Sequence, residues 1–93
     1  MLIKEFGPSA IFVIEEIEKE SKEFKEKSGV IVSIAEMDKF LKVDLSYDSS
    51  YNLFYSVDIE NLIKTDITQE DLFNLFCYGW ELSEDKKSLI LKI

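Results

Sequence analysis

Hydrophobic and polar residues alternate most regularly between Phe40 and Glu60. On both sides of the polar sequence Asp48-Ser49-Ser50, every second residue is apolar, which is typical of strands that bury one face. The pattern predicts an antiparallel hairpin with a three-residue loop, because this loop length places the two apolar sets on the same face. We expect Tyr47 to lie opposite Tyr51 in this hairpin.

The same register places aromatic residues beside acidic residues on the other face of the predicted hairpin. Phe54 would lie opposite Asp44, and Phe40 would lie opposite Asp58. Two interpretations remain open. Either another element covers the two rings, which is the commoner arrangement for aromatic side chains, or the rings stay exposed as part of a contact surface.

The segment before the hairpin predicts one long helix and two strands. Met1–Phe6 favours a short first strand. Apolar residues at helical spacing then predict a helix of about twenty residues between the N-cap Ser9 and Gly29, although residues 10–14 alone also fit a buried strand. Val30–Ala35 is apolar and rich in β-branched residues, which predicts a strand buried on both sides.

The segment after the hairpin predicts a second, shorter helix. We expect Asn61–Asp66 to be a connection and Gln69–Tyr78 to be helical. Thr68, followed by Asp71 at the third position, has the pattern of a capping box, in which each side chain satisfies a backbone N–H of the other residue. Several start signals therefore agree on where this helix begins.

A second hairpin closes the sequence, with Trp80–Ser83 paired to Ser88–Ile93 and Leu82 facing Leu89. The predicted order is β-α-β-β-β-α-β-β, in which the first strand is optional. Consecutive hairpins with interspersed helices indicate an α+β fold. We expect residues 1–93 to form a single α+β domain, with an antiparallel sheet of four to six strands, a long N-terminal helix and a short second helix.

The composition argues against catalysis. All 11 basic residues are lysines, so the sequence contains neither histidine nor arginine. Histidine is the usual general base near neutral pH, and arginine is the usual bidentate ligand of phosphate and carboxylate groups. We therefore predict a protein that is not an enzyme and that has no catalytic residues and no cofactor.

One segment has the spacing of metal ligands, but the rest of the pattern is missing. Asp44, Ser46 and Asp48 resemble the start of a calcium-binding loop, yet Ser49 stands where such a loop needs glycine and Tyr55 where it needs glutamate. The sequence predicts no metal site.

The single cysteine, Cys77, excludes an internal disulfide and fits a reducing compartment. Its position near the end of a predicted helix favours a small core residue over a reactive thiolate. No apolar run is long enough to cross a bilayer. We predict a cytoplasmic protein without a membrane partner.

Negative charge is concentrated in the second half of the sequence. The net charge is -8, and the segment from Asp44 to Asp85 has ten acidic residues and one lysine. Such a surface repels nucleic acid and anionic membranes and accelerates association with a basic protein. The alternative is that the charge serves only to keep the protein soluble.

Tyrosine and phenylalanine are interleaved with these acids at one end of the central hairpin, and tyrosines ringed by carboxylates are typical of binding hot spots. The candidate partner-binding residues are Asp44, Tyr47, Asp48, Tyr51, Phe54, Asp58 and Glu60. The small, acidic character of the chain resembles that of bacterial immunity proteins and other stoichiometric inhibitors, although no motif carries the resemblance. The resemblance implies a basic protein partner such as a nuclease.

Two other functions remain open. A structural or assembly module would form a homodimer through an apolar sheet face, through Phe40 and Phe54, or through an open sheet edge. A carboxylate-dependent enzyme or small-ligand binder would use Asp58 and Glu60.

Overall fold

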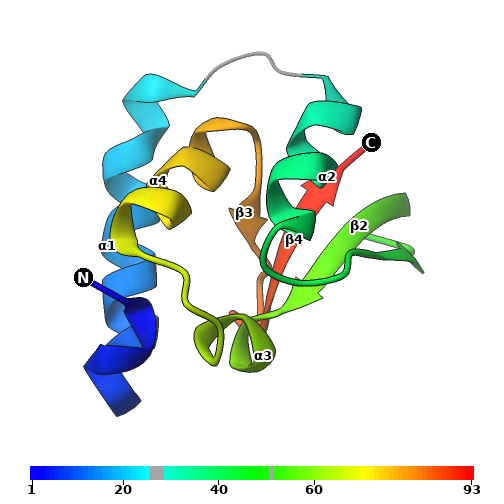
Figure 1. Cartoon of the computed structure of the whole chain (residues 1–93). Coiled ribbons are helices and arrows are strands. Elements are labelled where there is room, and N and C mark those ends of the chain that lie inside the picture. The colour runs from blue at the N-terminus through cyan, green and yellow to red at the C-terminus, as the bar shows by residue number, and fades with distance from the viewer. Residues whose placement is uncertain (26–28, 51) are drawn as a thin grey trace.

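The computed structural model describes residues 1–25, 29–50 and 52–93. The described residues form, in order, η1 (Ile3–Ser9), α1 (Ala10–Ser21), η2 (Lys22–Phe24), α2 (Val30–Asp38), β1 (Asp44–Asp48), β2 (Asn52–Asp58), α3 (Ile59–Ile63), α4 (Gln69–Cys77), β3 (Glu81–Leu82) and β4 (Ser88–Lys92), where η denotes a 3-10 helix. The four strands form one antiparallel sheet in the order β1-β2-β4-β3. Helices α1, α4 and α2 lie on one side of this sheet, and α3 lies at the end of β2 (Figure 1). The predicted α+β class is confirmed, and the antiparallel sheet has four strands, within the expected range of four to six.

The core lies between the helices and one face of the sheet. That face contributes Val57 from β2 and Leu89 and Leu91 from β4, all of which are buried. Trp80 is fully buried between the layers, and its indole Nε1 donates a hydrogen bond to the carbonyl oxygen of Ser33 at 3.0 Å. This bond ties α2 to the segment that follows α4.

The predicted strand Val30–Ala35 is wrong, because these residues belong to helix α2. Ser33 and Met37, four residues apart, are buried on one side of the helix, while Ile31 keeps 83% of its surface exposed. The Ser33 hydroxyl also donates to the Tyr78 carbonyl at 2.7 Å. Helical packing and this hydrogen bond override the weak strand preference of the β-branched residues.

The predicted first strand, Met1–Phe6, is also wrong. This segment enters the 3-10 helix η1, and only Leu2 makes a β-bridge, to Thr68. The Leu2 amide donates to the Glu5 side chain at 3.4 Å, which favours a turn over an extended chain. Gly7, with φ of 56°, then redirects the backbone into α1 in a conformation that residues with a Cβ rarely adopt.

Residues 10–14 are helical, which resolves the ambiguity between helix and strand. The helix is shorter than expected, because α1 ends at Ser21 and its 3-10 continuation η2 ends at Phe24. The buried Ser21 hydroxyl donates to the Glu18 carbonyl at 2.7 Å and so competes with the regular helical bond. Lys25 is already extended, with ψ of 128°.

The central hairpin forms with its pairing shifted by two residues. Tyr47 lies opposite Leu53, and Leu45 lies opposite Tyr55. The expected partner of Tyr47, Tyr51, lies outside the described residues. Because side chains alternate with a period of two, the shift leaves each residue on its predicted face.

The shift changes which residues meet on the other face. Phe54 lies opposite Ser46 instead of Asp44. Phe40 does not lie opposite Asp58, because β1 begins only at Asp44. Phe40 instead follows α2 and packs, half-buried, against the core.

The C-terminal half agrees more closely with the sequence analysis. Thr68 and Asp71 form the predicted capping box of α4, with hydrogen bonds of 3.0 and 3.1 Å. Leu82 lies opposite Leu89 as predicted. The expected connection 61–66 is wrong in its first part, because residues up to 63 belong to the short helix α3.

Candidate protein-binding face

The sheet has a second face, on the side away from the core, which we call the outer sheet face. Opposed residues of antiparallel strands point to the same side, so the register defines its members. The outer sheet face consists of Asp44, Ser46 and Asp48 from β1, Asn52, Phe54, Ser56 and Asp58 from β2, Ser88, Ile90 and Lys92 from β4, and Glu81 from β3. Four of the seven predicted partner-binding residues therefore share one surface: Asp44, Asp48, Phe54 and Asp58.

The acids of this face differ in how they are held. Asp44 is exposed on β1. Asp48 is also exposed, and its Oδ1 accepts a hydrogen bond from the Ser50 amide at 2.7 Å, which fixes the carboxylate at the start of the loop. Lys92 lies on the same face and forms an ion pair with Glu81 at 3.5 Å.

Asp58 has a structural task at the end of β2. Its Oδ1 accepts hydrogen bonds from the amides of Glu60 at 2.8 Å and Asn61 at 3.4 Å, so Asp58 is the N-cap of α3. Glu60 is exposed in the first turn of α3, where a negative charge is favoured by the helix dipole. The strand that was expected to carry Glu60 has already ended at Asp58.

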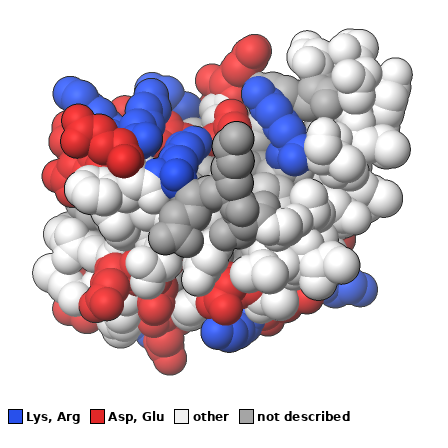
Figure 2. Space-filling view, turned by 90° about the horizontal axis from the view of Figure 1, so that it is seen from above, with Lys and Arg blue, Asp and Glu red and all other residues white. Residues whose placement is uncertain are grey.

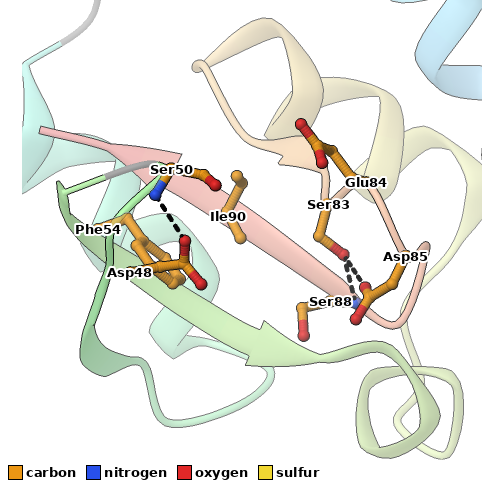
Figure 3. A pocket seen from close by; sticks show the side chains of 8 residues that line it. All are labelled: Asp48, Ser50, Phe54, Ser83, Glu84, Asp85, Ser88 and Ile90. Atoms are coloured by element: carbon orange, nitrogen blue, oxygen red, sulfur yellow. Dashed lines mark hydrogen bonds between the residues drawn. The ribbon is translucent and has the colours of Figure 1, made fainter.

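Phe54 is half-buried, which lies between the two interpretations considered for its ring. It borders a hollow of about 280 Å³ on the outer sheet face (Figure 3). The lining side chains are Asp48, Ser50, Phe54, Ser83, Glu84, Asp85, Ser88 and Ile90. Ile90 is only 2% exposed although it points away from the main core, so it forms an apolar floor.

Two acids of the hollow, Glu84 and Asp85, were not among the predicted site residues. They lie in the loop between β3 and β4, and Asp48 belongs to the end of β1. The sequence contains the acidic loop, but its position beside the first hairpin depends on the pairing of β2 with β4, which no local pattern specifies. Three carboxylates from two hairpins thus border one hollow.

Asp85 is held as an ionised carboxylate. Its Oδ1 accepts a hydrogen bond from the Ser83 hydroxyl at 2.6 Å and another from the Lys87 amide at 3.0 Å. These bonds, led by that of Ser83, lower the pKa of Asp85 below its usual value. These hydrogen bonds therefore favour the negatively charged form of Asp85 at the rim of the hollow.

Tyr47 lies apart from the acids, because it points to the inner side of the sheet. It is 72% exposed, and its neighbours Leu45 and Leu53 are 58% and 51% exposed. Figure 2 shows largely uncharged side chains on the right-hand side of the molecule, where β1 and β2 lie in Figure 1. The end of the hairpin thus presents apolar side chains that the helices do not cover.

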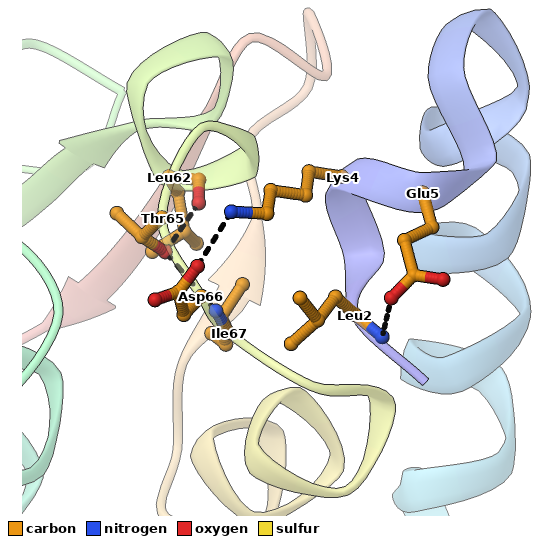
Figure 4. A network of polar contacts seen from close by, with 7 residues as sticks. All are labelled: Leu2, Lys4, Glu5, Leu62, Thr65, Asp66 and Ile67. Carbon is orange, nitrogen blue, oxygen red and sulfur yellow. Dashed lines mark hydrogen bonds and ion pairs between the residues drawn. The ribbon is translucent and has the colours of Figure 1, made fainter.

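A second polar cluster holds the N-terminal segment in place (Figure 4). Lys4 forms an ion pair with Asp66 at 2.5 Å, and the Ile3 amide donates to the Ile67 carbonyl at 2.9 Å. The Lys4 ammonium, by hydrogen bonding and by its charge, lowers the pKa of Asp66. These contacts join η1 to the loop before α4 and have a structural role.

Among the described residues, no group of three side chains of the metal-ligating types is placed to hold a metal ion. No helix in the described part of the chain is both long and apolar enough to span a membrane. Comparisons with protein-family models, curated proteins and solved structures gave no match.

Proposed function

We propose that this protein is a non-catalytic interaction domain that binds a basic protein partner through its outer sheet face, as a stoichiometric inhibitor of the immunity-protein type. The observation that carries the proposal is the hollow, which Asp48, Glu84 and Asp85 line together with Phe54 and Ile90. A lysine or arginine side chain has the matching chemistry, with an apolar stem and a positive head. The Phe54 ring adds a surface suited to a cation.

The remaining acids of the face extend this complementarity. Asp44 lies on the same face as Asp48, and Asp58 ends the neighbouring strand. Exposed charges of this kind chiefly increase the association rate, whereas side chains enclosed in the hollow determine how long the complex lasts. The proposal places the complex in the cytoplasm, in keeping with a sequence whose single cysteine excludes an internal disulfide.

The test is affinity capture from a lysate of the cells that make the protein, at low and moderate salt. The bait is the wild type, an Asp48→Lys/Glu84→Lys variant, or a Glu16→Lys/Glu20→Lys control. The control makes the same change in net charge on α1, where both glutamates are exposed. The proposal expects a basic protein that is retained by the wild type and the control, is released by salt and is lost with the variant.

Two outcomes would contradict the proposal. Equal loss of the captured protein with the variant and with the control would mean that net charge alone explains the binding. Retention of no basic protein by the wild type would remove the proposed partner class.

A second candidate function is a homodimeric assembly module. The observation that favours it is the apolar end of the hairpin, where Leu45, Tyr47 and Leu53 are all more than half exposed. An apolar dimer interface is insensitive to salt, whereas the proposed basic partner is not. Sedimentation equilibrium at two ionic strengths distinguishes the two functions, because only the assembly module predicts a dimer of unchanged affinity.

A further inference from the structure

The two edges of the sheet differ. The edge strand β3 has only two residues, and its Leu82 amide donates to Glu18 Oε2 of α1 at 2.6 Å. The other edge strand, β1, has five residues, and β2 is its only strand partner in the described part of the chain. An edge strand of this length presents backbone groups to which a further strand can bond.

Strand β1 presents charged side chains on one face of the sheet and apolar side chains on the other. Asp44 and Asp48 point to the outer sheet face, and Leu45 and Tyr47 point to the inner side. All four are exposed. A strand added to β1 would therefore meet carboxylates on one face and apolar side chains on the other.

We infer that the basic partner docks by adding a strand to β1, with lysine or arginine beside Asp44 and Asp48 and apolar residues beside Leu45 and Tyr47. The inference rests on the proposed function and specifies its binding mode. In such complexes backbone hydrogen bonds supply affinity, and alternate side chains supply specificity. Oppositely charged cross-strand pairs add to both the affinity and the specificity.

Charge also indicates that the added strand does not come from a second copy of this chain. Antiparallel self-pairing about Ser46 would place Asp44 opposite Asp48 of the second copy, twice over. Like charges directly opposite each other destabilise a strand pair. Two opposite-charge pairs improve binding by about 2- to 30-fold relative to two uncharged Ala–Ala pairs, and two like-charge pairs weaken it. The charge pattern thus selects a basic strand over self-association.

The experiment titrates the whole, isotope-labelled chain with short peptides and follows backbone amide resonances and their hydrogen exchange. The probes are a peptide of alternating lysine and valine, its glutamate–valine counterpart, and the lysine–valine peptide with N-methyl groups on alternate amides. We expect the lysine–valine peptide to slow amide exchange in residues 44–48. The glutamate peptide should bind about 10-fold more weakly, and the N-methylated peptide should not protect β1.

Variants of the two aspartates make the test specific. The wild type should prefer the lysine–valine peptide. Asp44→Lys/Asp48→Lys should instead prefer the glutamate–valine peptide, and Asp44→Asn/Asp48→Asn should show a weaker preference for the lysine–valine peptide. The Glu16→Lys/Glu20→Lys control should keep the wild-type order. The inference is overturned if the lysine–valine peptide fails to bind at millimolar concentration, if it binds without protecting residues 44–48, or if N-methylation has no effect.

The same exchange measurement on a captured partner separates this inference from the proposed function. Slower exchange in residues 44–48 in the complex supports both. A complex that depends on Asp48 and Glu84 but leaves exchange in β1 unchanged supports the proposed function and overturns strand addition. If no basic partner is captured, the proposed function fails, and the peptide titration still decides whether the edge accepts a strand.

Discussion

At the scale of single residues, a few buried polar contacts connect segments that are distant in the sequence. Trp80 is fully buried and donates its indole N–H to the Ser33 carbonyl. The Ser33 hydroxyl returns a bond to Tyr78, on the same segment as Trp80. This pair of bonds fixes α2 against the end of α4, so these side chains specify the position of a helix as well as its stability.

Replacement of Trp80 by phenylalanine should lower the free energy of unfolding by about 2 kcal/mol, because it leaves the Ser33 carbonyl without its donor and opens space in the core. The measurement is urea unfolding followed by circular dichroism, since Trp80 is the only tryptophan. Phe12→Ala is the control, because Phe12 is 67% exposed and its loss should cost less than about 0.5 kcal/mol. Equal losses would contradict the account.

Asp58 is a further residue whose role the structure redefines. Asp58→Ala should cost about 0.5–2 kcal/mol, because the first amides of α3 lose their side-chain acceptor. Asp58→Asn keeps an acceptor oxygen and should retain most of the stability. If the two variants unfold at the same urea concentration, the cap is not the source of the effect. Asp58 is therefore a poor position at which to test partner binding.

The two carboxylates with lowered pKa values, Asp66 and Asp85, predict how stability depends on pH. A carboxylate whose pKa is lower in the folded than in the unfolded chain stabilises the fold above the unfolded value of about 4. This contribution decreases as the pH falls through the folded pKa. We expect stability to decline below about pH 4 and carbon-detected NMR titration to give both groups pKa values below the usual one.

Two substitutions test the causes of these shifts. Lys4→Ala should raise the pKa of Asp66, since it removes both the hydrogen bond and the charge. Ser83→Ala should raise the pKa of Asp85 and leave that of Asp66 unchanged. A pKa of Asp85 that stays the same in Ser83→Ala would contradict the assigned hydrogen bond.

At the scale of elements, local signals predicted some segments and failed for others for identifiable reasons. Helix α4 was predictable because Thr68 and Asp71 determine its start within a few residues. Helix α2 was not, because its conformation depends on the burial of Ser33 and on the contact of Ser33 with Tyr78, far along the chain. The β-branched composition of α2 is an average preference that such tertiary contacts outweigh.

The hairpins show a similar division. The alternation in β1 and β2 correctly predicted which residues share a face, because faces depend only on the period. The pairing itself is shifted by two residues from the predicted register. Because a shift of two residues preserves the alternation of apolar and polar positions, that alternation cannot distinguish the two registers. Side chains on a strand can be assigned to a face from sequence with more certainty than to a cross-strand partner.

Glu18 supplies a prediction about the protected edge strand. Its carboxylate accepts a hydrogen bond from the Leu82 amide. Glu18→Ala should therefore lower the free energy of unfolding by about 1 kcal/mol. It should also accelerate hydrogen exchange at Leu82. Glu20→Ala on the exposed part of the same helix is the matched control and should change neither quantity. Unchanged exchange at Leu82 in Glu18→Ala would mean that the bond does not protect this edge.

At the scale of the whole molecule, the chain separates charge from apolar surface across one sheet. Asp44, Asp48 and Asp58 lie on the outer sheet face, and the exposed Leu45, Tyr47 and Leu53 lie at the inner side of the same hairpin. Period-two alternation placed Asp44, Phe54 and Asp58 on one face, whereas Asp48, expected in the loop, joins them because it belongs to the end of β1. Glu84 and Asp85 could be found only once β4 was known to pair with β2, because this pairing brings the second hairpin loop to the first.

The separation of charge predicts how association with a partner responds to salt. The wild type should bind a basic partner rapidly at low ionic strength and more slowly as salt screens the face. Charge reversal of Glu16 and Glu20 on α1 should change the association rate less, because these glutamates lie outside the outer sheet face.

The claim that the outer sheet face binds a basic partner is tested most directly by the rate of association. The association rate constant of a captured basic partner is measured at low salt with the wild type, with Asp48→Lys/Glu84→Lys and with Glu16→Lys/Glu20→Lys. We expect the first variant to slow association by about 10-fold or more, and the second, with the same net charge, to stay within about threefold of the wild type. Equal slowing by the two variants would contradict the claim, because binding would then respond to net charge and not to the outer sheet face.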